Sequence, residues 1–148
     1  MTTLLVIINF IKPQSMKEVS KYINETLGAN AIVDPIPKND LGNLPMYTTQ
    51  AYKLYNMELF NRELVLLELK NEDELSLLQV DKHLQLLKNT LNKVLILVLE
   101  NLPAYNRKRL IERGINFIVP GKQLFLPELL VNLSENYTQA KTKQKNKR

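Results

Sequence analysis

The sequence contains no cysteine and only one histidine, His83. The absence of cysteine excludes disulfide bonds and thiol chemistry. It is also compatible with a reducing cytoplasm, where we expect the protein to be located. A zinc site is not expected, because its usual ligands are thiolates and imidazoles and one imidazole cannot form it. We therefore expect no resident cofactor.

Glycine is scarce, with four residues in a chain of 148. Phosphate-binding loops such as G-x-G-x-x-G and G-K-[ST] need glycines where the backbone approaches the phosphates, and neither pattern occurs. A G-x-S-x-G nucleophile elbow is absent as well. These absences disfavour nucleotide cradles and serine hydrolases.

Long hydrophobic runs are lacking too. The apolar stretch at residues 4–11 is too short to span a bilayer, which takes about 20 residues. No basic segment precedes it and no small-residue cleavage site follows it, so we do not expect a signal peptide. We interpret the stretch as part of the core and expect no membrane contact.

The excess of positive over negative charge lies in the last eight residues of the chain. The net charge is +5, and the last eight residues hold five basic side chains and no acid. The preceding 140 residues therefore hold 15 basic and 15 acidic groups, and the body has no overall field that would attract a polyanion. The five cations are candidates for phosphate contact: Lys141, Lys143, Lys145, Lys147 and Arg148.

An unbroken apolar run of strand-forming residues, Val94–Leu99, is the strongest pattern in the chain. Such a run is typical of a strand that is covered on both faces. We expect Asn101 to cap the next helix, with Pro103 in its first turn and Gly114 at its end. A second apolar strand, Ile115–Val119, follows, so the two strands should be parallel neighbours in a βαβ unit.

A β-hairpin is predicted upstream of this unit. Residues 52–60 alternate in polarity, residues 63–70 are rich in strand formers, and a turn is expected at Asn61-Arg62. Short strands are also expected at Ala31–Val33 and at Gln123–Leu126.

Three further helices are predicted. The first is opened by a capping box, with Ser15 as the cap and Glu18 three residues later, and this helix ends at Gly28. The second runs from Glu74 to about Leu91, capped by Asn71 or Asp73, because apolar residues recur there at steps of three and four. His83 borders this apolar stripe, and we interpret it as a half-buried structural residue. A last helix is expected over residues 129–137.

The order of these elements predicts one α/β domain over residues 1–137. We expect a three-layer, α/β/α-like arrangement with a mixed sheet of about five strands, in which a β-hairpin is followed by a βαβ unit. The same order also suits a restriction-endonuclease-like topology. Residues 138–148 are expected to form a disordered basic tail.

One segment resembles a known family. The stretch NLPAYNRKRLIERGINFIVPGKQLFLPEL, residues 101–129, is similar to a segment of bacterial MarR-like winged-helix transcriptional regulators, and a looser similarity covers residues 15–133. In those proteins an α/β domain precedes a winged helix, whereas this chain ends in a polar tail. The resemblance implies a bacterial transcription-regulator-related domain that lacks the DNA-binding winged helix. It would act through protein–protein or interdomain contacts, with a protein partner or as a homo-oligomer.

A different class of function is suggested by Glu68-x-Lys70. In a strand both side chains leave the same face, and a carboxylate for Mg²⁺ beside a lysine is how PD-(D/E)xK nucleases are built. Such a site needs an acid on the preceding strand, and Glu58 or the more distant Asp34 could supply it. The alternative interpretation is thus a metal-dependent nuclease, or its inactive descendant, with Mg²⁺ as cofactor and Glu58, Glu68 and Lys70 as catalytic residues.

The predicted helix after Asn101 carries a basic run that is a second candidate for phosphate contact: Arg107, Lys108, Arg109 and Arg113. Arg109 and Arg113 should share a face, whereas Arg107 should lie over Ala104 and Ile111, towards the core. Cations near the end of a helix also complement its dipole. We favour a structural or interdomain role for this run.

The charge distribution generates a first prediction. Removing residues 141–148 should abolish binding to duplex DNA, which we expect to be weak, independent of sequence and mediated by the tail alone. Five phosphate contacts give a log–log salt slope of at most about −4.5, so binding should weaken steeply towards physiological salt. Retention on a DNA column at increasing salt measures both effects. A truncated chain that still selects one operator over random sequence would show that another surface reads bases.

Overall fold

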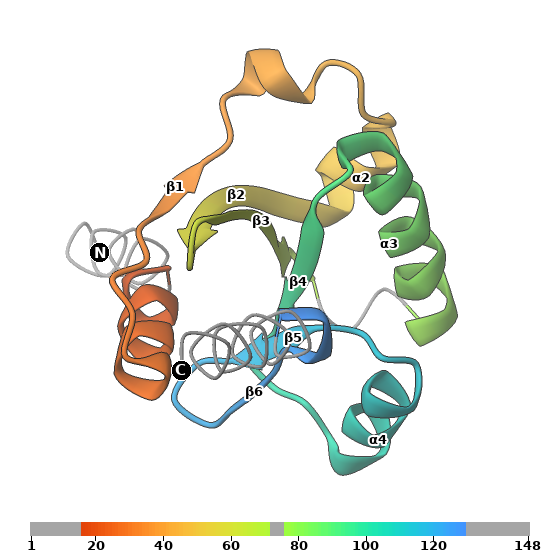
Figure 1. Ribbon diagram of the computed structural model, residues 1–148. Coiled ribbons are helices and arrows are strands. Elements are labelled where there is room, and N and C mark those ends of the chain that lie inside the picture. The colour runs from red at the N-terminus through yellow and green to blue at the C-terminus, as the bar shows by residue number, and fades with distance from the viewer. Residues whose placement is uncertain (1–15, 72–75, 130–148) are drawn as a thin grey trace, which may run out of the picture.

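The computed structural model describes residues 16–71 and 76–129 (Figure 1). Residues 16–27 are helical, and we call them the N-terminal helix. The other elements are β1 (Val33–Pro35), the 3₁₀-helix η1 (Lys38–Leu41), α2 (Met46–Ala51), β2 (Tyr52–Leu59), β3 (Arg62–Leu69), α3 (Leu77–Leu91), β4 (Val94–Val98), α4 (Ala104–Glu112), β5 (Phe117–Val119) and β6 (Gln123–Phe125).

The strands form one mixed sheet of six strands, in the order β1-β2-β3-β4-β5-β6. The pairs β1/β2, β2/β3 and β5/β6 are antiparallel. The pairs β3/β4 and β4/β5 are parallel, and the helices α3 and α4 connect them. The predicted α/β class is confirmed, with six strands where about five were expected.

Helices cover both faces of the sheet and make three layers. Figure 1 shows the N-terminal helix on one side of the sheet and α3 with α4 on the other. One core cluster joins the sheet to α3 and α4, through residues such as Leu67, Leu87 and Leu110. A second cluster joins the opposite face to the N-terminal helix, through residues such as Val19 and Leu66.

The strand β4 is buried along its whole length, as the apolar run predicts. Leu95 and Leu97 belong to the cluster under α3 and α4, whereas Val94, Ile96 and Val98 belong to the cluster under the N-terminal helix. This division follows from the alternation of side chains along a strand. The parallel pairing of β4 with β5 is confirmed as well.

The hairpin is confirmed, but its turn lies one residue earlier than predicted. Tyr52 pairs with Leu69 and Leu59 pairs with Arg62, so the two-residue loop is Phe60-Asn61. Both loop residues have positive φ, at 51° and 64°. That conformation matches the twist of a hairpin but is unusual for a phenylalanine. The residue types at Phe60-Asn61 therefore do not indicate a two-residue turn at this position.

Two predicted helix caps are wrong. The N-cap of α3 is Ser76, rather than Asn71 or Asp73, and it forms a capping box with Gln79. The helix therefore starts later than Glu74. Several residues in this stretch are good caps, and the sequence does not decide between them; Ser76 is the one that forms the reciprocal bond to the third helical residue.

The N-cap of α4 is Pro103, rather than Asn101, and no side chain bonds to the first turn. Gly114 follows the end of this helix with φ of 67°, as expected of a residue that takes the left-handed conformation.

Some expectations differ from the structure in their bounds or lie outside the described residues. The first strand lies at Val33–Pro35 rather than Ala31–Val33, and β5 starts at Phe117. The apolar stretch 4–11, the cap Ser15, the residues after Leu129 and the basic tail lie outside the described residues. Within the described part of the chain, no helix is long and apolar enough to cross a membrane.

The burial of β4 generates a prediction for stability. Ile96→Ala should lower the free energy of unfolding by about 2–5 kcal/mol, because the side chain of Ile96 is fully buried in the core between the sheet and the N-terminal helix. Ile32→Ala is the matched control, since 70% of Ile32 is exposed, and it should change the free energy by less than about 0.5 kcal/mol. Urea denaturation of both variants measures the difference. Equal losses in the two variants would contradict the placement of β4.

Candidate functional site

Glu68 and Lys70 lie at the end of β3 that is nearest to α2. Glu68 is partly buried, opposite Lys53 of β2 and Val98 of β4. The Nζ of Lys70 donates a hydrogen bond to the carbonyl oxygen of Thr49, at 2.8 Å. Glu68 alternates with Leu64 and Leu66 and so lies on the sheet face of the N-terminal helix, whereas Lys70 follows the end of β3. The lysine is therefore held by α2.

The structure does not bring Glu58 to this pair. Glu58 lies opposite Glu63 at the far end of the hairpin, five residues along β3 from Glu68. That separation is about 16 Å at the usual rise of a strand. Alternation also places Glu58 on the sheet face of α3 and α4, whereas Glu68 is on the other face. The three predicted catalytic residues do not form one site.

Asp34, the second acid considered, does not complete the site either. It pairs with Asn56, and alternation places it on the sheet face of Glu58, opposite to that of Glu68. Among the residues that the structure describes, no three histidine, aspartate or glutamate side chains are placed to hold a metal ion. The Mg²⁺-dependent interpretation therefore has no assembled site in the described residues.

The acids Asp34, Glu58 and Glu63 instead line a groove of about 680 Å³ beside the tip of the hairpin. The ammonium of Lys93 lies 3.1 Å from a carboxylate oxygen of Glu63 at the edge of this groove. The strand register places Glu58 directly opposite Glu63. Like charges in such a pair lower the stability of the sheet.

Two other grooves flank β1 and are lined by lysines. The first, which we call the helix groove, has a volume of about 690 Å³ and lies between the N-terminal helix and β1; its lining is Met16, Lys17, Ser20, Lys21, Asn24, Ile32, Val33, Pro35, Lys53 and Tyr55. The second, the loop groove, has a volume of about 520 Å³ and lies between β2 and residues 35–42; its lining is Pro35, Ile36, Leu41, Gly42, Thr49, Tyr52, Lys53, Leu54, Tyr55 and Lys70.

Pro35, Lys53 and Tyr55 line both grooves, so the two grooves meet at these side chains. Burial, and secondarily the carboxylate of Glu68, raise the pKa of the Tyr55 hydroxyl above its ordinary value. Tyr55 is therefore a neutral hydrogen-bond donor at the junction.

Two of the four predicted cations in and after α4 contact neighbouring elements. Arg113 forms an ion pair with Asp81 of α3, with 2.7 Å between Nη1 and Oδ2. The Nη1 of Arg107 donates to Oε1 of Gln123 in β6, at 3.5 Å. These contacts fix α4 against α3 and β6, which agrees with the structural role that we favoured for the basic run.

The expected orientation of Arg107 towards the core is wrong. Leu110 is the buried residue of α4, whereas Ala104, Arg107 and Ile111 are exposed. The apolar positions of this helix are few, so its sequence gives no clear stripe, and the contact of Leu110 with the core sets the rotation instead. Arg109 lies over the ring of Tyr105, with 4.2 Å between its Cζ and the ring centroid.

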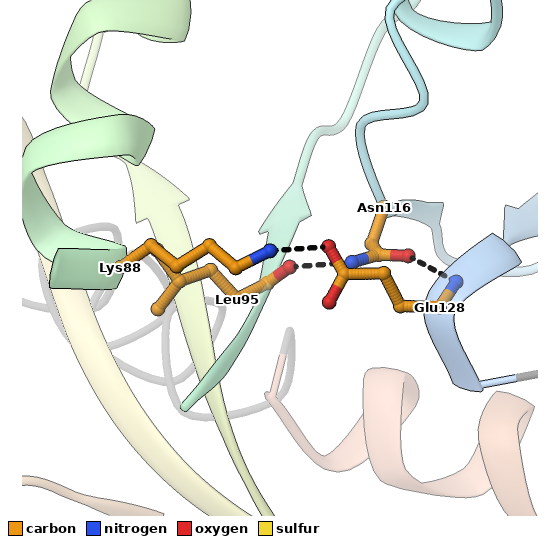
Figure 2. Close-up of polar contacts among 4 residues, drawn as sticks. All are labelled: Lys88, Leu95, Asn116 and Glu128. Carbon is orange, nitrogen blue, oxygen red and sulfur yellow. Dashed lines mark hydrogen bonds and ion pairs between the residues drawn. The ribbon is translucent and has the colours of Figure 1, made fainter. Parts of the chain in front are cut away.

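A buried asparagine directly before β5, Asn116, links β4 to the segment after β6 (Figure 2). The Nδ2 of Asn116 donates to the carbonyl oxygen of Leu95 at 3.1 Å, and its Oδ1 accepts from the backbone N–H of Glu128 at 3.4 Å. Lys88 of α3 lies 3.1 Å from the Glu128 carboxylate. Because a buried amide must find partners, Asn116 favours one arrangement of β4, β5 and residues 126–129.

His83 is half-buried, as predicted, in a small aromatic cluster with α2 and β2. Its Nδ1 and the hydroxyl of Tyr52 are hydrogen-bonded at 2.9 Å, and the ring of Tyr47 packs at a centroid distance of 5.1 Å. Burial raises the pKa of Tyr52 and lowers the pKa of His83. The arrangement suits a structural histidine that stays neutral near pH 7.

The sequence did not point to the lysine-lined grooves or to Asn116. Lys17 and Lys21 lie one helical turn apart and gave only the signal of a solvated helix face. Lys53 precedes Tyr55, Met57 and Leu59 on one side of the alternating strand and gave no separate signal. Nothing in the composition of INF at residues 115–117 indicates that its asparagine is buried at 4% exposure.

Comparisons with family models, with curated proteins and with solved structures give no match for this chain. The resemblance to winged-helix regulators therefore stays a prediction.

The lowered pKa of His83 generates a prediction for pH dependence. The folded state disfavours the protonated imidazole, so the stability from neutral His83 is fully present above the ordinary pKa of 6.5 and is lost as the pH falls below it. His83→Gln keeps a partner for Tyr52 but does not titrate. Urea denaturation from about pH 7.5 to 5 should show a steeper loss of stability in the wild type than in the variant. Parallel profiles would contradict the burial of the neutral ring.

Proposed function

We propose that the chain is a transcription-regulator-related domain that acts through protein–protein contact, and that α4 is the contact surface. The observation that carries the proposal is the outer face of α4, where an exposed tyrosine and arginine form a stacked pair. Tyr105 is 63% exposed although the guanidinium of Arg109 lies over its ring. Tyrosine and arginine are the residue types enriched among the energetically dominant positions of protein interfaces.

The surface is ordered before any partner binds. Arg113 is tied to Asp81 in α3 and Arg107 is hydrogen-bonded to Gln123 in β6, so α4 has fixed contacts on two sides. A surface that is already ordered loses less conformational entropy on association.

The chemistry of the face favours an acidic partner. Arg107, Lys108 and Arg109 are exposed cations on a helix whose only acid is Glu112. The exposed apolar area of Tyr105, together with Ile111 at 41% exposure, suits a protein surface better than a phosphate backbone. The partner that fits is a protein segment that combines carboxylates with apolar side chains. The domain's role in transcription rests on the resemblance of residues 101–129.

The test compares two double variants in cells that produce the protein. Tyr105→Ala/Arg109→Ala removes the stacked pair, and Lys82→Ala/Gln85→Ala changes exposed positions of α3 as a matched control. Affinity for the purified partner should fall at least tenfold in the first variant, because truncating a dominant interface residue costs about 2 kcal/mol or more. The control should bind like the wild type.

Transcript profiles provide the second measurement. Loss of the whole gene and the Tyr105→Ala/Arg109→Ala variant should alter the same set of transcripts, whereas the control variant should not. Unchanged transcripts after loss of the gene would refute the regulatory role. A partner that binds the Tyr105→Ala/Arg109→Ala variant normally would refute the assignment of α4.

A further inference from the structure

The two grooves beside β1 have a one-sided charge. Four lysines line them, Lys17, Lys21, Lys53 and Lys70, and neither groove is lined by an aspartate or glutamate. The acids of this edge of the sheet line the separate groove at the hairpin tip. A concave surface that gathers charge of one sign concentrates ligands of the opposite sign.

Lys53 occupies the junction of the two grooves and is the central cation. Its side chain is partly buried, and within residues 16–71 and 76–129 its ammonium has no hydrogen bond or ion pair. An ammonium that has no partner within the protein is available to an anion. The hydroxyl of Tyr55 lines the same junction and adds a neutral donor.

The other lysines are less available than Lys53. Lys21 lies 4.0 Å from the exposed carboxylate of Glu25, and Lys70 is hydrogen-bonded to the carbonyl of Thr49. Glu68 lies opposite Lys53 in the strand register, and its carboxylate offsets part of the positive charge. The lysines still outnumber these two acids, so the junction favours an anion.

The loop groove supplies an apolar wall next to this cationic junction. Ile36, Leu41 and Leu54 line it, with Pro35 at the boundary to the helix groove. Ile36 and Leu41 are partly buried against the core below, so part of their surface faces the groove. A cationic junction that opens onto an apolar groove matches a ligand with an anionic head and an apolar chain.

We propose that the joined grooves bind a small anionic amphiphile. Its head lies between Lys53, Tyr55 and the lysines of the N-terminal helix, and its chain lies along Ile36, Leu41 and Leu54. The chemical class is an acyl or alkyl chain that ends in a carboxylate or a phosphate. The site lies on the β1 edge of the sheet and is independent of the α4 surface.

The test titrates the full chain with soluble probes, below their micelle concentrations, and follows binding by amide NMR spectra. The probes are decyl phosphate, decanoate, decanol and inorganic phosphate. Decyl phosphate or decanoate should shift the amide signals of Ile36, Lys53 and Tyr55. Each should bind at least about tenfold tighter than decanol and than inorganic phosphate, because only they use both the cations and the apolar wall. The two anionic probes distinguish a phosphate head from a carboxylate head.

Two variants test the central residues. Lys53→Met keeps the length of the side chain but removes its charge, and it should weaken binding of the anionic probe about fivefold to tenfold. Lys53→Arg should restore the binding. Lys122→Met, at the exposed turn before β6, is the matched control and should bind like the wild type. If Lys53→Met does not fold, Lys17→Gln/Lys21→Gln on the exposed helix face takes its place.

Several results would overturn the proposal. Equal binding of decanol and decyl phosphate would show that the cations have no role, and equal binding of inorganic phosphate would show that the apolar groove has none. Unchanged affinity in Lys53→Met, or an equal loss in Lys122→Met, would place the ligand elsewhere. The absence of binding by every probe would refute the site.

Discussion

The burial of β4 on both faces is the constraint on which the rest of the structure depends. A strand of five apolar residues can avoid water only if one layer covers each of its faces. The parallel connections on either side of β4 place α3 and α4 on one face. The other face then has to be covered by a helix from elsewhere in the chain, and the N-terminal helix covers it. Three layers follow from one short run of sequence.

Elements that this constraint governs could be predicted from the sequence. The apolar stripe of α3 and the alternation of the hairpin have periods of about 3.6 and 2, and each period identifies both the element and its buried face. Leu84 and Leu87 were expected at the core and lie there. Both patterns record burial, which the hydrophobic effect imposes along the whole length of an element.

The first residue of α3 and the buried position of Asn116 could not be predicted from hydrophobic periodicity. Asn71, Asp73 and Ser76 are all suitable caps, and the choice of Ser76 depends on its bond to Gln79. Asn116 was expected inside the strand Ile115–Val119, with no sign of a polar site, and it is buried where it bonds the carbonyl of Leu95 and the N–H of Glu128. These outcomes depend on single tertiary contacts, which leave no periodic signal in a sequence.

Strand register explains why a plausible catalytic set was wrong in its geometry. Sequence spacing suggested that Glu68 and Lys70 share a face, but only Glu68 lies in β3, and Lys70 follows the end of the strand and bonds to Thr49 of α2. Glu58 belongs to the partner strand, and its position depends on where the hairpin turns. A turn at Phe60-Asn61 pairs Glu58 with Glu63 at the tip, whereas Lys53, Glu68 and Lys70 lie at the other end. The polar residues of this hairpin are therefore separated into two groups along its length.

The same separation bears on how the two proposed surfaces relate. The lysine-lined grooves lie at the β1 edge of the sheet, whereas α4 packs near β5 and β6 and is tied to Gln123. Between them lie β3 and β4, whose fully buried side chains form close-packed cores on both faces. Such a core shifts only between discrete packings rather than bending gradually, and Asn116 adds a polar bond that favours one of them. A ligand in the grooves would stabilise the domain as a whole, through its preference for the folded state.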